Sequence, residues 1–297
     1  MEAAEALGPA RRSASRRLSD LFHHRPRLTV AGLLAGPMGW LAIGYLGSLV
    51  VLLAASLWGV NALTGEVTQT FSLDNFKTLI NTPVYRTVAF RTVAIAAAVT
   101  ATDAILAFPI AFYMAKVARR RAKAVLVVAV LMPLWSSYLV KVYAWRTILS
   151  SGGILNWALD PLGLHGPGYG NVAVWLVMSY LWLPYMIIPI FAGLERIPDS
   201  VLAASEDLGA GPTTTFRRVI LPLSFPAVVA GSIFTFSLTL GDYITPQLVS
   251  NNQFIGNVVF NNISNNLPLA SAFATVPILI MVAYLLIARK LGAFEHL

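Results

Sequence analysis

Six apolar runs limit the folds that this chain can adopt. Each run has few or no charged residues. An apolar helix of about 20 residues spans the roughly 30 Å hydrocarbon core of a bilayer, so the sequence predicts an all-α membrane protein with six transmembrane helices. The runs cover approximately residues 31–58, 87–115, 122–145, 171–194, 223–247 and 269–288.

The composition excludes a water-soluble domain. The chain is 57% hydrophobic and 11% charged, with a mean hydropathy of +0.70, which leaves too little polar surface for water. The first apolar run contains Gly36-Pro37 and no small-residue cleavage site, so we interpret it as a retained helix. We expect a basic arm over residues 1–27 and one six-helix domain over 28–297. With no cysteine, the chain has neither disulfides nor thiolate metal sites.

The lysines and arginines predict the orientation of the helices. If the six helices alternate, 16 of the 21 basic residues lie on the side that holds both termini. Basic residues gather on the cytoplasmic side of a membrane, so we expect both termini in the cytoplasm. The 16 are Arg11, Arg12, Arg16, Arg17, Arg25, Arg27, Lys116, Arg119, Arg120, Arg121, Lys123, Arg196, Arg217, Arg218, Arg289 and Lys290.

The formal net charge of +8 then reports topology and contact with anionic lipid, and gives no reason to expect nucleic acid. The opposite side has fewer basic residues, and residues 248–268 carry no charge. The N-terminal stretch ARRSASRRLSDLF can form a basic helix on the membrane surface; a disordered arm is the alternative.

A compact polar element interrupts the apolar pattern between the fourth and fifth runs. It lies within a cytoplasmic loop, residues 195–222, and includes the stretch AASEDLGAGPTTTFRRVILP. Asp199 or Ser200 can cap a short helix, Gly209 can end it in the left-handed conformation, and Pro212 prevents simple continuation. A well-structured connecting loop is the alternative to a functional element. The apolar strip of the short helix consists of Leu202, Ala203, Ala204 and Leu208.

This stretch resembles the signature of ABC-importer permeases, written E-A-A, three residues, G, nine residues, I, one residue, L-P. Gly209 is followed by nine residues and then by Val219 and Leu221-Pro222, while Ala203 stands where the signature has Glu. The resemblance implies a coupling helix that docks in a groove of a separate ATP-hydrolysing subunit, and Ala203 removes any salt bridge that the Glu would make. The residues assigned to ATPase coupling are Ala203, Ala204, Ser205, Glu206, Asp207, Leu208, Gly209 and Pro222.

The resemblance covers most of residues 80–290. The stretches MPLWSSYLVKVYAWRTILSSGGILNWAL, LPYMIIPIFAGLERIP and TLGDYITPQLV are similar to the spermidine/putrescine permeases, in particular to the first of the two permeases in that system. Relatives that import ferric iron, sulfate, thiamine or phosphonates share the general plan. The resemblance implies the type I importer (MetI-like) fold in a bacterial plasma (inner) membrane.

It also implies partners: a second homologous permease, two ATP-binding subunits and an extracytoplasmic substrate-binding protein. The chain has no G-x-x-x-x-G-K-[ST] loop, so ATP and magnesium would be held by the ATPase subunit. It has no HExxH motif and no nucleophile–base arrangement, so we predict no catalytic residue, no metal site and no enzyme activity of its own.

Two acids inside the apolar runs are candidates to line a path for a polycation. Asp103 falls near the middle of the second run, where an unpaired acid costs about 2.5 to 3.5 kcal/mol. Asp242 lies toward the outer part of the fifth run. A carboxylate balances an ammonium group, and aromatic rings hold its charge and methylene chain. The substrate-path candidates are Asp103, Trp135, Tyr138, Tyr143, Asp242 and Tyr243, with Trp145, Tyr180 and Trp182 as further aromatics.

Structural roles are the alternatives. Asp103 can hydrogen-bond Thr100 or Thr102 or pair with another subunit, and most of the aromatics can be packing or interface-belt residues. Lys141 argues against a polycation; we interpret it as reaching to the outer headgroups, with an anionic substrate as the alternative. Outside the importer class, a secondary transporter would use Asp103 as a proton or ion site, and a membrane-embedded enzyme would need a catalytic constellation.

Overall fold

The computed structural model describes residues 26–61 and 64–290, and the chain divides into two compact units, Met1–Ala54 and Ala55–Leu297. The predictions for the N-terminal arm therefore lie outside the described residues. The described part of the first unit is helical: α2 (Pro26–Trp40), a π-helical segment η1 (Leu41–Leu46) and α3 (Gly47–Ala55), which reaches the unit boundary. Residues Gly32–Ala55 form one helix that is long and apolar enough to span a membrane.

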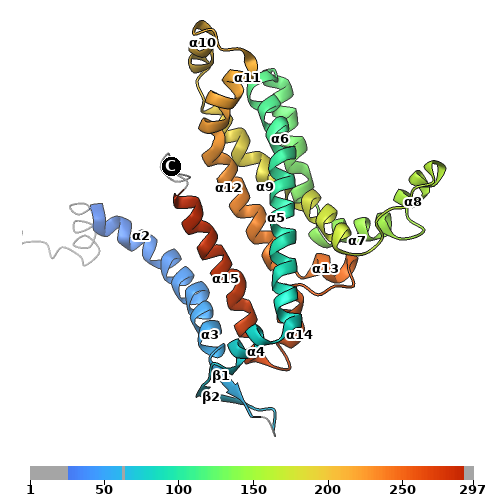
Figure 1. The fold of residues 1–297 in the computed structure, drawn as a ribbon. Helices are drawn as coiled ribbons and strands as arrows, with labels where there is room; N and C mark the ends of the chain where they lie inside the picture. Colours follow the sequence, from blue (N-terminus) through green and yellow to red (C-terminus); the bar gives the residue numbers. More distant parts are fainter. Residues whose placement is uncertain (1–25, 62–63, 291–297) are drawn as a thin grey trace, which may run out of the picture. The chain divides into compact units, whose positions relative to one another are not determined.

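The second unit contains the other membrane helices (Figure 1). Its three central helices, α5, α9 and α12, pack against one another more extensively than any other elements. α5 is extended by the π-helical segment η2. α12 is preceded by the short helix α11 and the π-helical segment η4. The bounds are α5 (Pro83–Phe112), η2 (Tyr113–Val117), α9 (Asn171–Glu195), α11 (Pro212–Thr215), η4 (Phe216–Ile220), α12 (Leu221–Gly241) and α15 (Leu267–Lys290).

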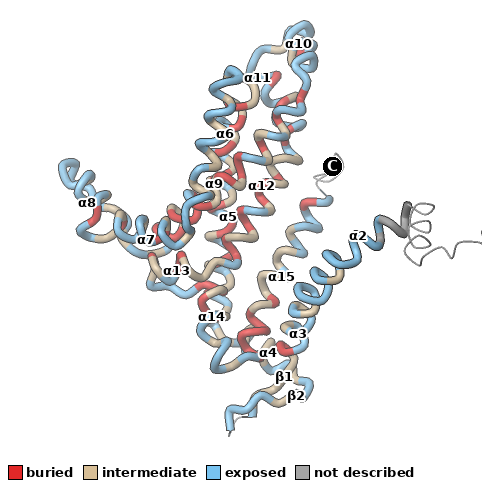
Figure 2. Tube along the Cα trace, turned by 180° about the vertical axis from the view of Figure 1, so that it is seen from behind, coloured by how far each residue is buried: buried red, intermediate tan, exposed pale blue. Residues whose placement is uncertain are grey.

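The core lies where the central helices meet. Buried residues gather on the facing sides of α5, α9 and α12, as Figure 2 shows. One apolar cluster includes Val99 of α5 with Val177 and Met178 of α9, and a second includes Ala107 of α5 with Met186 and Ile190 of α9. The outward sides of the helices are apolar but exposed, which suits lipid or another membrane chain.

The prediction of one straight helix over residues 122–145 is wrong. The structure has α6 (Arg120–Trp135) and α7 (Tyr138–Leu149), bent by 89° at Ser136-Ser137. Pro133 has no N–H to donate within α6, and the hydroxyl of Ser136 donates to the Pro133 carbonyl oxygen at 2.9 Å. Both features weaken helix continuation. The described residues thus hold five candidate spans, or six if the bent pair counts as one.

The fifth predicted helix, residues 223–247, is also broken. α12 ends at Gly241, Asp242 is extended, and the short helix α13 (Ile244–Val249) follows. At its other end the helix is longer than predicted, because α11 and η4 continue into α12 and the span covers Pro212–Gly241. Asp242 and Tyr243 therefore lie in a break between helices.

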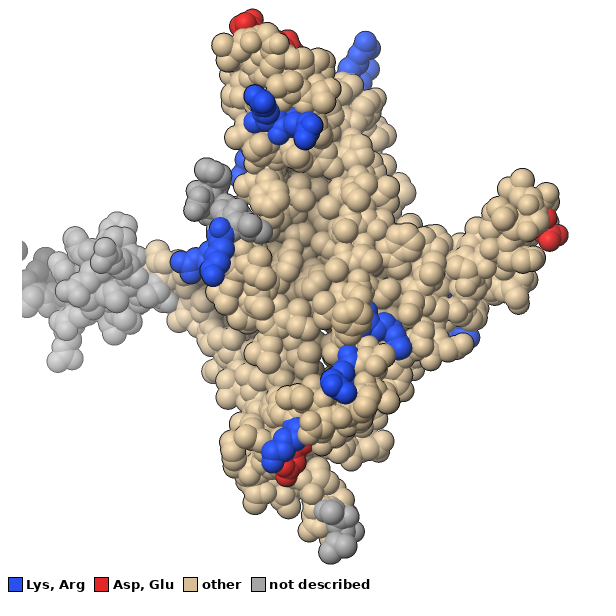
Figure 3. Space-filling view, viewed as in Figure 1, with Lys and Arg blue, Asp and Glu red and all other residues tan. Residues whose placement is uncertain are grey.

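The remaining elements lie at the ends and side of the second unit. The sequence did not predict the antiparallel hairpin of β1 (Trp58–Val60) and β2 (Val67–Phe71). This hairpin lies at the opposite end from α10 (Asp199–Asp207), and α8 projects sideways (Figure 1). Figure 3 shows a broad uncharged surface with scattered basic side chains and a few acidic ones, at the α10 tip, on the sideways projection and at the opposite end. The other elements are α4 (Asp74–Asn81), α8 (Ile154–Leu159), η3 (Asp160–Leu162) and α14 (Ile255–Asn262).

Candidate functional site

A hydrogen bond between Tyr138 and Asp242 joins the α6–α7 bend to the α12–α13 break. Tyr138 is the first residue of α7, and its hydroxyl donates to Asp242 Oδ2 at 2.6 Å. Thr245 Oγ1 donates to the same oxygen at 2.7 Å and lies 2.7 Å from the Tyr138 hydroxyl. Interrupted helices close to each other are typical of substrate and ion sites in membrane transporters. We therefore define Tyr138, Asp242 and Thr245, with Trp182, as the break site.

The Asp242 side chain also binds the first residues of α13. Its Oδ1 accepts hydrogen bonds from the main-chain N–H groups of Ile244, at 2.9 Å, and Thr245, at 3.2 Å. This is the bonding of a helix cap, which satisfies N–H groups that have no partner inside the helix. The Asp-x-x-Thr spacing is a signal by which Thr245 could have been predicted. Asp242 thus caps the start of α13 and connects the α12–α13 break to α7 through Tyr138. It also places a negative charge there.

Aromatic rings cover the break site. The ring of Tyr138 stacks on Trp182 of α9, with centroids 6.0 Å apart and planes 13° apart. Trp182 in turn lies edge-on to Tyr185, also at 6.0 Å. The Nε1 of Trp182 is buried and has no hydrogen-bond partner among the described residues. A carboxylate beside stacked aromatic faces can hold an ammonium group by charge and by cation–π contact.

The other aromatic candidates lie outside this group. Trp135 and Tyr143 are 79% and 52% exposed, on α6 and α7. Tyr243 stacks on Phe260 of α14 with centroids 4.6 Å apart. Trp145 packs against Tyr180, with centroids 5.4 Å apart. Of the predicted path residues, all within the described part of the chain, only Tyr138 and Asp242 are joined to each other by a hydrogen bond.

Lys141 does not reach outward to headgroups as predicted. Its ammonium donates to the carbonyl oxygen of Pro133 at 3.0 Å, across the bend between α6 and α7. The last carbonyls of a helix lack intrahelical partners and carry partial negative charge. Lys141 therefore stabilises the end of α6 at the bend, and the charge that argued against a polycation has a local structural partner.

Asp103 makes no hydrogen bond to the break site, although its neighbour Ser179 lies three residues before Trp182 on α9. Its side chain is fully buried on the side of α5 that faces α9, and neither carboxylate oxygen has a hydrogen-bond partner among the described residues. Ser179 of α9 is a polar neighbour, but its Oγ does not reach hydrogen-bond geometry either. The proposed bonds to Thr100 and Thr102 are wrong: Thr100 donates to the Ala96 carbonyl, and Thr102 accepts from Trp175 Nε1.

The 195–222 loop forms a short helix with a sharp end. Gly209 has a φ of +78°, and its N–H donates to the Glu206 carbonyl at 2.8 Å. This confirms the predicted left-handed ending. The predicted start is wrong in detail, since the residue that precedes α10 is Pro198 and no side chain caps the helix. Asp199 pairs with Lys116 instead, at 3.0 Å.

The outer side of α10 is open. Leu208 is 88% exposed, and Ala203, Ala204, Glu206 and Asp207 are exposed as well. Leu202 is half-buried, and Ser205 is buried, with its hydroxyl 2.9 Å from that of Thr215. Pro222 lies in the first turn of α12. The exposed strip is suited to a partner's groove, and the Ser205–Thr215 pair, which the sequence did not single out, holds the helix from behind.

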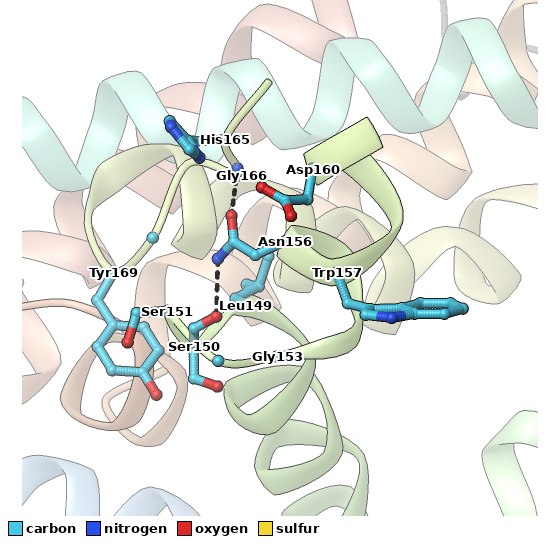
Figure 4. A pocket seen from close by; sticks show the side chains of 12 residues that line it. Leu149, Ser150, Ser151, Gly153, Asn156, Trp157, Asp160, His165, Gly166 and Tyr169 are labelled. Carbon is cyan, nitrogen blue, oxygen red and sulfur yellow. Dashed lines mark hydrogen bonds between the residues drawn. The ribbon is translucent and has the colours of Figure 1, made fainter. Parts of the chain in front are cut away.

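A separate pocket of about 780 Å³ lies beside α8 (Figure 4). Asn156 shapes it by donating to the Ser150 carbonyl at 2.8 Å and accepting from the Gly166 N–H at 2.7 Å. Asp160 and His165 also line it. The pocket shares no residue with the break site. Among the described residues, no group of three or more His, Cys, Asp or Glu side chains is arranged to hold a metal ion.

Similar structures support the fold. The crystal structure of a bacterial ABC transporter involved in the import of the acidic polysaccharide alginate matches with a TM-score of 0.67 and 16% identity, over 92% of this chain and 99% of that one. A bacterial alginate ABC transporter in complex with an alginate pentasaccharide-bound periplasmic protein matches with a TM-score of 0.69 and 15% identity, over 92% and 96%. At such identities the likeness concerns the fold alone.

Similar sequences identify the family. The inner membrane ABC transporter permease protein YdcU of Escherichia coli is 44% identical over 95% of both chains. The spermidine/putrescine transport system permease protein PotB of Haemophilus influenzae is 30% identical over 68% of this chain and 72% of that one. Residues 76–292 match the family described as binding-protein-dependent transport system inner membrane component. The chain belongs to this family, and it is an inner-membrane permease subunit of an ABC importer.

Proposed function

We propose that this permease subunit imports polyamines of the spermidine and putrescine type. The observation that carries the proposal is the break site, where the Asp242 carboxylate accepts a hydrogen bond from Tyr138, whose ring stacks on Trp182. These groups offer a negative charge and aromatic faces to a flexible polycation. The bond from Lys141 to Pro133 supports the same cargo, because it gives that cation a role within the bend. Similarity to PotB also favours it.

We propose the same partners as the family resemblance implies: a second homologous permease, two ATP-binding subunits and an extracytoplasmic binding protein. The exposed strip on α10, with Leu208 88% exposed, fits a groove on the ATP-binding subunit, which would hold ATP and magnesium. The basic residues near the α10 end of the second unit support a cytoplasmic position for this end and for both termini.

Closure of the ATP-binding subunits would displace α10. The two permeases would then open outward around a shared path, and hydrolysis would reset them. In this scheme the break site receives the ammonium groups from the binding protein. In this scheme the chain forms part of the transport path and contributes the coupling helix α10, and the ATP-binding subunits hydrolyse ATP.

Uptake into proteoliposomes tests the proposal. The whole complex is reconstituted with ATP inside and the binding protein outside, and radiolabelled spermidine and putrescine are supplied. ATP-dependent accumulation is expected. If the ATPase activity is stimulated only by a binding protein loaded with another solute, the substrate is not a polyamine but ferric iron, sulfate, thiamine, phosphonate or a similar small solute. Gradient-driven uptake without any ATPase would favour a secondary transporter instead.

A further inference from the structure

Two lysines tie the start of the 195–222 loop to the turn between α5 and α6. Lys116, in η2, donates to the Ile197 carbonyl oxygen at 2.6 Å and to Asp199 Oδ1 at 3.0 Å. The Lys116 side chain is 11% exposed, whereas that of Asp199 is 91% exposed. The carbonyl bond is therefore the one protected from water, and it fixes the main chain directly before α10.

Lys123 makes the second tie. It lies in the first turn of α6, and its ammonium is 2.7 Å from Glu195 Oε1, at the last residue of α9. The ammonium also lies 5.9 Å from the centroid of the Phe191 ring, and 3.4 Å from the Ala115 carbonyl oxygen. A half-exposed ion pair alone contributes little. Here the ring and the carbonyl hold the same ammonium in place.

The far end of the loop is fixed to α5 as well. Phe216, in η4, packs edge-on against Phe108 and Phe112, with centroids 5.6 Å and 6.4 Å apart. The buried Ser205–Thr215 pair joins α10 to α11. The loop is therefore anchored at both of its ends to the α5–α6 region, and α10 projects between these anchors.

Besides α9, which carries Trp182 and ends at Glu195, two helices run from this loop region to the break site. α12 continues from the loop and ends directly before Asp242. α6 begins three residues before Lys123, and its bend leads directly into Tyr138. At 1.5 Å per residue, α6 is about 24 Å long and α12 about 32 Å long. Figure 1 shows both helices starting near α10 and α11.

We propose that Lys116 and Lys123 are positioning residues that transmit a displacement of α10 to α6, so that α6 and α12 act together on the Tyr138–Asp242 bond. This inference rests on the proposed coupling function. The connections form a closed frame. It runs from the loop along α12 to the Tyr138–Asp242 bond and back along α6, and the bonds of Lys116 and Lys123 connect α6 to the loop. Without the ties, a displacement of α10 would reach the break site along α9 and α12 but not along α6, and Tyr138 and Asp242 would move relative to each other.

Charge exchange tests Lys123. The variants Lys123→Glu, Glu195→Lys and the double exchange are reconstituted in the complete complex, and labelled spermidine uptake and ATP hydrolysis are measured together. Each single variant should lower the solute carried per ATP by roughly fivefold, and the double exchange should restore part of it, because it recovers the ion pair but not the contacts of the ammonium with the Phe191 ring and the Ala115 carbonyl. A general loss of folding would not be rescued by the exchange. Unchanged ratios in both single variants would overturn the role of Lys123.

A distance measurement tests the frame directly. The chain has no cysteine, so spin labels on Cys introduced at Arg120 and Ser200, both exposed, report only this pair when the partner subunits are used in cysteine-free form. In the otherwise native complex the distance should be the same with and without bound ATP. Lys116→Met should make it nucleotide-dependent, and Lys116→Arg should retain the native behaviour. A nucleotide-dependent distance without the Lys116 change would overturn the proposal.

The two tests separate this inference from the proposed function. If the complex transports no polyamine but its ATPase responds to another loaded binding protein, the ratio of that solute to ATP is measured in the same variants. If the native complex is coupled and the lysine variants are equally coupled, only the positioning role fails. If the chain shows no dependence on an ATP-binding subunit, the proposed function and this inference fail together.

Discussion

The hydroxyl of Tyr138 donates a 2.6 Å hydrogen bond to the carboxylate of Asp242, a residue 104 positions away in the chain. The bond connects the bend between α6 and α7 to the break between α12 and α13. Because each break interrupts a long apolar helix, the bond links two segments that can change direction independently. Its strength should therefore determine how closely these segments move together.

Tyr138→Phe should loosen this connection without removing the ring that stacks on Trp182. A hydrogen bond to a charged group contributes about 1.5 to 3 kcal/mol, so we expect a lower melting temperature of the purified complex and slower polyamine uptake. The control is Tyr143→Phe, on the same helix, where the side chain is 52% exposed. Equal melting temperatures and uptake rates for the two variants would show that the Tyr138–Asp242 bond is not a joint.

Asp242→Asn separates the charge of Asp242 from its role as a helix cap. Asn caps helices about as well as Asp, so α13 should still begin at the same place. The loss of negative charge should raise the KM for spermidine, by about tenfold if one ammonium contact of about 1.4 kcal/mol is lost. Asp242→Ala should lose both functions and also lower the melting temperature. An unchanged KM in the Asn variant would remove Asp242 from the substrate path.

Gly209→Val should uncouple ATP hydrolysis from transport while leaving membrane insertion intact. A Cβ at Gly209 meets no atom within 4 Å, so the effect would come from its φ of +78° alone. Left-handed backbone costs a residue with a side chain about 1 to 2 kcal/mol, and more for a β-branched one. Gly211→Ala is the matched control, because this glycine has equal space and a φ of −71°. Normal substrate-stimulated turnover in Gly209→Val would contradict the coupling role of α10.

The apolar runs predicted the membrane helices because hydrophobic length is a property of each segment by itself. The same is true of the end of α10, where Gly209 supplies a local conformation. The breaks at Ser136-Ser137 and Asp242 were missed because the surrounding residues are apolar enough to continue a span. The pairs Tyr138–Asp242, Ser205–Thr215 and Lys123–Glu195 depend on tertiary packing, which a single sequence does not reveal.

Leu208→Glu should weaken binding of the ATP-binding subunit and leave the permease itself intact. Leu208 is 88% exposed, so its side chain contributes little to the fold, and burial of a leucine in a partner's groove contributes about 1.5 to 3 kcal/mol. We expect at least a tenfold loss of affinity, measured by titrating the ATP-binding subunit onto the reconstituted permeases. Leu162→Glu is the control, because this leucine is 71% exposed and lies in η3, outside the 195–222 loop. If both variants bind the ATP-binding subunit as tightly as the native chain, the exposed strip of α10 is not its docking surface.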